Sequence, residues 1–212
     1  MTSIIITTMA SCNTDGINPE PELTPQESGV CIISSSLTQD EYATVSGQIC
    51  DAINFSTRAL GNELSENEAK SILKPLANDG RLIQGQLLQQ KDKLALTSVE
   101  IKEIRGMTDM QLADLSFSIN SMYNGAISTQ SIGSKDVVDC LLYATGFDSL
   151  SSLFKGGIEL GCISNYYNGT RLLMSAKNAR QIILAFAKRS MGWVGIAWMV
   201  YDFGSCIKSK QK

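Results

Sequence analysis

Apolar residues recur every three or four positions through most of the first half of this chain, which is the spacing of an amphipathic helix. The clearest run begins after Thr38 and ends near Gly61. Four runs open with a hydroxyl residue that is followed three positions later by Glu or Gln, the spacing of a capping box. These boxes begin at Thr38, Ser65, Thr97 and Thr108, and they predict four helices. A further helical stretch is predicted over Leu82–Leu94, and Pro75 is expected to kink or end the helix before it.

The second half of the chain is more apolar, and fewer of its predicted helices begin with a capping motif. It predicts helices over residues 137–143, 148–154, 171–188 and 191–203, with a turn at Asn168 and Gly169. The chain is therefore expected to be all-α: an irregular multi-helix bundle of seven to nine helices over residues 30–212. A candidate sub-boundary lies near residues 125–134. Only Pro75 of the four prolines falls within this predicted domain, which agrees with a helical fold.

The N-terminus carries a different pattern. An apolar run over residues 3–8 is followed by the small residues Ala10 and Ser11 and then by Cys12. This order is typical of a lipoprotein signal peptide, in which the cysteine thiol is acylated after the preceding residues are removed. Met9 stands where Leu, Val or Ile is usual, and no Lys or Arg precedes the run, so the true start is expected upstream or Met1 begins a shortened chain. The alternative is that the β-branched residues of this run form a buried strand.

Residues 12–29 are acidic, contain three prolines and have few apolar side chains. Such a segment cannot bury enough surface to offset its loss of conformational entropy, so we expect a disordered tether. The residues Met9–Cys12 resemble a lipobox, the motif at which a bacterial lipoprotein is cleaved and acylated. Followed by a tether and a helical domain, they resemble the layout of small cell-envelope lipoproteins of Bacteroidota. The resemblance implies a lipid anchor in the bacterial envelope, at the outer membrane, and brings no functional residues with it.

The last predicted helix, Met191–Phe203, is apolar on all sides and holds both tryptophans, Trp193 and Trp198. A run of this length is shorter than the ~20 residues that cross a bilayer and is typical of a core helix. We therefore expect this helix to be buried on most sides, with Trp198 in the packed core. The alternative is a segment that inserts into a target membrane, with Lys188 and Arg189 beside it.

Charge is distributed unevenly along the chain, whose net charge is −3. Residues 171–212 contain eight Lys or Arg against the single Asp202. This basic segment suits an anionic membrane surface or another envelope protein, and it suits equally a face that packs near the acidic first half. A sequence pI of about 5.1 argues against a nucleic-acid partner.

Six cysteines are present, and none lies at a CxxC spacing. With Cys12 acylated, five remain, so at least one is unpaired in an oxidising compartment. Cys140 and Cys206 lie on apolar helices of the same half and are the candidate disulfide. Free buried thiols are the alternative.

Chemistry-bearing motifs are scarce. The chain has no histidine, which removes the usual general base and the commonest metal ligand. Neither a GxxxxGK[ST] nor a GxGxxG motif occurs, so no nucleotide partner, cofactor or metal is expected. The sequence favours a non-enzymatic accessory or interaction protein of the envelope. The alternatives are a secreted, bacteriocin-like toxin that uses Met191–Phe203 and, last, an enzyme with a dispersed carboxylate site.

Overall fold

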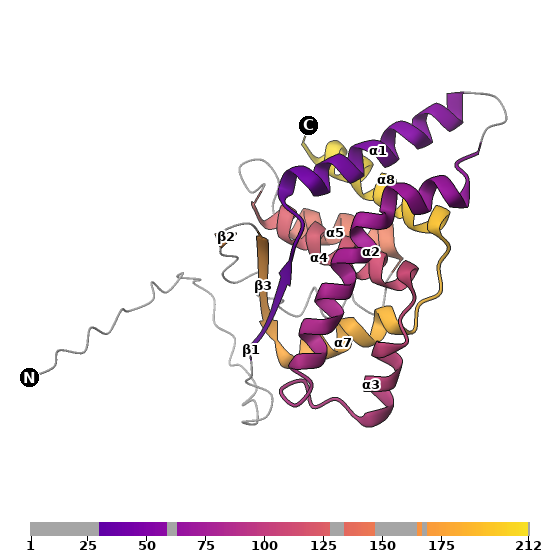
Figure 1. The fold of residues 1–212 in the computed structure, drawn as a ribbon. Coiled ribbons are helices and arrows are strands. Elements are labelled where there is room, and N and C mark those ends of the chain that lie inside the picture. The colour runs from indigo at the N-terminus through magenta and orange to yellow at the C-terminus, as the bar shows by residue number, and fades with distance from the viewer. Residues whose placement is uncertain (1–29, 59–62, 128–133, 147–164, 167–168, 212) are drawn as a thin grey trace, which may run out of the picture.

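The computed structural model describes residues 30–58, 63–127, 134–146, 165–166 and 169–211. Cys12, the predicted signal peptide and the predicted tether lie outside these residues. The described chain is predominantly helical, which confirms the predicted all-α class (Figure 1). Its helices are α1 (Gln39–Arg58), α2 (Glu66–Gln89), α3 (Ser98–Arg105), α4 (Asp109–Ile127), α5 (Ser134–Thr145), α7 (Ala176–Ala187) and α8 (Trp193–Lys210).

The predicted caps begin four of these helices. Thr38, Thr97 and Thr108 each form the two reciprocal hydrogen bonds of a capping box, with Glu41, Glu100 and Gln111 respectively. Ser65 accepts a hydrogen bond from the backbone N–H of Glu68 at the start of α2. These contacts satisfy backbone donors that have no partner within the helix, and they span only three residues.

Two predicted helix boundaries are wrong. Helix α2 continues through Pro75, which therefore does not end it, and the predicted stretch over Leu82–Leu94 is the continuation of α2 as far as Gln89 and not a separate helix. Pro75 is exposed on the surface of α2, as is Ser71, whose carbonyl loses its intrahelical donor and can be solvated there. The helix predicted to begin at Arg171 begins instead at Ala176, after the N-cap residue Ser175.

The residues before Ser175 belong to a small antiparallel sheet that the helical pattern did not predict. Its strands are β1 (Val30–Ser35), β2 (Asn165–Tyr166) and β3 (Gly169–Ser175), in the order β1-β3-β2. In β1 the buried residues Cys31, Ile33 and Ser35 alternate with the more exposed Ile32 and Ser34, as expected of a strand with one face on a core. The sheet lies beside the helices, with α2 next to β1 (Figure 1).

Helix α4 is the centre of the core, since every residue from Leu112 to Met122 is buried. Phe117 of α4 stacks on Tyr42 of α1 with ring centroids 6.3 Å apart, and it meets Phe203 of α8 edge to face at 5.6 Å. Three helices that are distant in sequence thus share one aromatic cluster. The predicted sub-boundary near residues 125–134 lies partly outside the described residues, and α4 and α5 on its two sides pack against each other.

Candidate functional site

The apolar segment that the sequence singled out forms most of helix α8. Its two tryptophans differ in how far they are exposed to solvent. Trp193 is buried, with 8% of its surface exposed, and its backbone N–H donates to Glu66 of α2 at 3.0 Å. Trp198 is 42% exposed and lies edge to face with Tyr201 at 5.6 Å. Six residues of the predicted segment are buried, as expected of a helix covered on most sides, but the expectation that Trp198 lies in the core is wrong. Among the described helices, none has the length and apolar character that crossing a membrane requires.

Lys188 and Arg189, the two cations that precede α8, also differ in position. The side chain of Lys188 is exposed and lies 3.9 Å from Glu103. Arg189 points into the protein, where Nη1 lies 3.0 Å from Oδ2 of Asp114 and Nη2 donates to the carbonyl of Thr145 at 2.6 Å. Of the four residues predicted to contact a membrane or partner, Trp193 and Arg189 are thus interior, and only Trp198 and Lys188 reach the surface.

Four of the eight basic residues in the C-terminal segment 171–212 form ion pairs with acidic residues of earlier helices. This arrangement is the second of the two that the charge pattern allowed, in which the positive face packs near the acidic part of the chain. At Glu100, a hydrogen bond from the backbone N–H of Thr97, within the capping box, and then one from Arg180 lower the pKa of the carboxyl to about 2. The pairs are Arg180 with Glu100, Lys188 with Glu103, Arg189 with Asp114 and Lys210 with Asp136.

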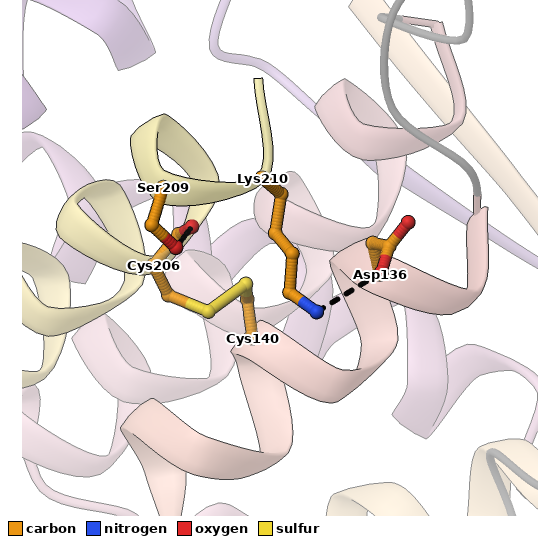
Figure 2. The surroundings of a disulfide bond; sticks show 5 residues. All are labelled: Asp136, Cys140, Cys206, Ser209 and Lys210. Atoms are coloured by element: carbon orange, nitrogen blue, oxygen red, sulfur yellow. Dashed lines mark hydrogen bonds and ion pairs between the residues drawn. A yellow bond between two sulfur atoms is a disulfide. The ribbon is translucent and has the colours of Figure 1, made fainter. Parts of the chain in front are cut away.

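The candidate disulfide is present. Cys140 of α5 and Cys206 of α8 are bonded, with their Cα atoms 5.6 Å apart, and close a separation of 66 residues. Figure 2 shows the bond crossing between the two helices, with the ion pair of Lys210 and Asp136 beside it at 3.3 Å. A covalent link and an ion pair therefore hold the end of α8 against α5.

Two further cysteines in the described residues, Cys31 and Cys50, are free thiols. Cys31 is fully buried, and burial raises the pKa of its thiol to about 11. Cys50 is half-buried on α1, and burial raises the pKa of that thiol too. Both groups therefore remain protonated at neutral pH and are poor nucleophiles there. Cys162 lies outside the described residues.

The most elaborate polar cluster surrounds Asp79, a buried residue of α2 that sequence reasoning missed. One carboxylate oxygen, Oδ2, accepts hydrogen bonds from Ser35 Oγ (3.0 Å), Ser116 Oγ (2.7 Å) and Asn120 Nδ2 (3.1 Å). The other, Oδ1, accepts from the backbone N–H of Ser36 (2.6 Å) and from its Oγ (2.9 Å). These donors satisfy the buried carboxylate, as a buried polar group requires.

The Asp79 carboxylate is buried, because Asp79, Ser116 and Asn120 are each at most 1% exposed, and only Ser36 at the edge of the cluster is exposed. A buried carboxylate whose oxygens are occupied by five protein donors is placed to join elements and not to take a proton from a substrate. It links β1, α2 and α4. A signal for it exists in the sequence, since Asp79 stands between Leu76 and Ile83 on the apolar face of α2.

Within the described residues, no group of three or more Cys, Asp or Glu side chains is arranged to hold a metal ion. No protein family, curated protein or solved structure matches this chain.

Proposed function

We propose that this chain is a lipid-anchored, non-enzymatic protein of a bacterial cell envelope that acts as an accessory or interaction module. The observation that carries the proposal is the disulfide between Cys140 and Cys206. Disulfides persist in oxidising compartments and are rare in the reducing cytosol. A disulfide-linked domain thus agrees with the lipobox that ends at Cys12, since a lipoprotein matures outside the cytosol.

The arrangement of α8 favours an interaction module over the membrane-active alternative. An inserting segment needs an apolar surface that it can present to lipid, and basic residues that can reach anionic headgroups. Here α8 is bound to α5 by the disulfide, and Arg180, Arg189 and Lys210 are engaged with acidic side chains. Releasing α8 from α5 would break the disulfide and the pair of Lys210 with Asp136, whereas Arg180 lies on α7 and would keep its pair with Glu100.

The anchor is tested by expressing the full chain in a lipidating bacterial host that is fed an alkyne-bearing fatty acid. We expect the wild type to carry the label and to sediment with membranes, because acyl chains at ~0.8 kcal/mol per buried methylene give stable attachment. Cys12→Ala should lose both properties and stay folded. Cys50→Ala, which removes a free thiol elsewhere, should behave as the wild type. Membrane sedimentation of Cys12→Ala would contradict the proposed anchor.

A second experiment distinguishes an interaction module from a membrane-active toxin. Folded Cys12→Ala protein is added to dye-filled vesicles that contain phosphatidylglycerol. We expect at most weak binding that is lost at high salt, since exposed charges are screened beyond about 8–10 Å at physiological ionic strength, and no release of dye. Salt-resistant binding with release of dye would favour the toxin.

A further inference from the structure

The two edges of strand β1 are held in different ways. One edge pairs with β3, in a register that sets Ile33 opposite Leu172. Successive residues of a strand direct their backbone groups to opposite edges, so the amides of Ile32 and Ser34 share the same edge. On the outer edge, at Ile32 and Ser34, side chains of α2 occupy the position that a further strand would take.

Two glutamines, Gln86 of α2 and its C-cap residue Gln90, bind this outer edge through their amide groups, and we count both with α2 below. Gln90 accepts from the backbone N–H of Ile32 at 3.1 Å and donates to its carbonyl at 2.8 Å. Gln86 does the same at Ser34, with distances of 2.7 Å and 2.9 Å. Each side-chain amide thus reproduces the donor and acceptor of a neighbouring strand. These four hydrogen bonds involve only backbone groups of β1 and do not depend on its side chains.

Asp79 continues the same row one step further along the strand. It accepts the backbone N–H of Ser36 at 2.6 Å, so alternate residues 32, 34 and 36 are each bound by α2. Asp79, Gln86 and Gln90 are separated by seven and four residues, the spacing that places side chains on one face of a helix. We call these three residues the polar row of α2.

The helices also contact one another directly, without β1 between them. Helices α2 and α4 approach so closely at Gly80 that a Cβ there would lie 2.0 Å from the carbonyl oxygen of Leu112. The disulfide joins α5 to α8. Strand β1 adds only Cys31 and Ile33 to the apolar core and is followed directly by Ser36, Leu37 and the cap of α1.

We propose that β1 is a releasable strap, which opens from and closes onto the helical bundle as one unit with the polar row of α2 as its lock. The backbone of the strap is bound at one edge by β3 and at the other by the polar row, and two of its side chains, Cys31 and Ile33, are buried in the core. Opening therefore breaks the ladder with β3 and withdraws these two side chains, while the direct contacts between α2 and α4 and between α5 and α8 stay in place. Opening separates Ser35 and Ser36 from Asp79 and exposes the thiol of Cys31, which the closed strap buries completely.

In the sequence, β1 is the first element after residues 12–29, which connect it to the proposed anchor at Cys12, and every helix lies later in the chain. A pull on that anchor is therefore expected to reach β1 before the helices. This role in responding to tension rests on the proposed lipid anchor at Cys12. The opening of the strap does not, and an unlipidated chain is therefore sufficient to test it.

The test is alkylation of Cys31 by iodoacetamide in folded, full-length Cys12→Ala protein, followed by peptide mass spectrometry. The half-buried Cys50 serves as the internal reference. We expect Gln86→Ala combined with Gln90→Ala to raise the alkylation rate of Cys31 at least about tenfold, since the change removes hydrogen bonds that hold only the closed state. The rate at Cys50 should stay unchanged.

Gln89→Ala is the matched control, because Gln89 is an exposed glutamine on the same helix. We expect it to leave the rate at Cys31 unchanged. Equal rates in all three proteins, or an equal rise for Gln89→Ala, would overturn the proposed lock.

Hydrogen exchange of the unaltered domain provides a second test that needs no variant in the polar row. We expect the amides of Ile32 and Ser34 to exchange at least tenfold faster than those of the buried helix α4. Exchange of both sets at one common rate would mean that β1 leaves only when the whole domain unfolds, and would overturn the strap.

Discussion

Arg189 Nη1 lies 3.0 Å from Oδ2 of Asp114, and both side chains are largely buried. The guanidinium also donates to the carbonyl of Thr145 at 2.6 Å, so one cation joins α4, the end of α5 and the segment between α7 and α8. A buried ion pair loses the hydration of both charges, and this loss can exceed the attraction between them.

The pKa of Asp114 indicates that desolvation prevails in this pair. Burial raises the pKa of its carboxyl from 3.8 to about 7, although the nearby charge of Arg189 acts in the opposite direction. Between about pH 4 and pH 7 the folded protein therefore holds a proton that the unfolded chain has released. The stability that this proton provides is present below pH 4 and is lost as the pH rises through 7.

We expect the free energy of unfolding of the wild type to fall by about 2–4 kcal/mol relative to Asp114→Asn between pH 4 and pH 8. Urea denaturation of both proteins at several pH values measures this difference and cancels the titration of other groups. A wild type that gains stability relative to Asp114→Asn over this range would show that the attraction of Arg189 outweighs burial.

Substitution by alanine is expected to have opposite effects on stability at two glycines of α2. A Cβ on Gly80 would lie 2.0 Å from the Leu112 carbonyl oxygen, so Gly80→Ala should force α2 and α4 apart and destabilise the protein by about 2–4 kcal/mol. A Cβ on Gly85 would meet nothing within 4 Å, so Gly85→Ala should stabilise the protein by up to about 1 kcal/mol through helix propensity. Thermal melts compare the two, and equal effects would contradict the close helix contact.

The tryptophans of α8 form a second matched pair. Trp193→Ala should destabilise the domain by about 3–5 kcal/mol, as large-to-small changes in packed cores do. Trp198 is 42% exposed and contacts Tyr201 edge to face, so Trp198→Ala should cost about 1 kcal/mol. Urea denaturation gives both values. A larger loss for Trp198→Ala than for Trp193→Ala would contradict the placement of α8.

Removal of the disulfide, by Cys140→Ala together with Cys206→Ala, should lower the stability by about 2–4 kcal/mol because the unfolded chain loses a cross-link. The melting temperature measures the loss. Addition of a reductant should lower the melting temperature of the wild type by a similar amount and leave the double variant unaffected. A wild type that melts at the same temperature with and without reductant would argue against the bond.

Features that depend on neighbouring residues were predictable from the sequence, and those that depend on distant partners were not. The boxes at Thr38, Thr97 and Thr108 close within three residues, so spacing alone locates them. Most of strand β3 was predicted as the start of a helix. Its partner β1 lies about 140 residues earlier, so the order of apolar and polar residues within β3 does not reveal the pairing.

The polar contacts inside the fold follow the same rule. Asp79 receives hydrogen bonds from serines 37 to 44 residues away, and Gln86 and Gln90 bind backbone groups 52 and 58 residues away. In the sequence Gln86 and Gln90 look like ordinary polar positions of a helix, and Asp79 stands out only by its place on the apolar face, which does not identify its partners. The disulfide also joins distant residues, but it could be predicted because Cys140 and Cys206 both lie on apolar helices predicted in the second half of the chain.

The measurement that most directly tests a disulfide-linked, lipid-anchored envelope protein is non-reducing peptide mapping of the full chain, purified from the membranes of a lipidating host. The proposal predicts an N-terminal peptide that begins at Cys12 and carries the mass of its acyl chains, and a second species in which the peptides of Cys140 and Cys206 are joined. An N-terminal peptide that retains residues 1–11 without lipid, together with free thiols at Cys140 and Cys206, would contradict it.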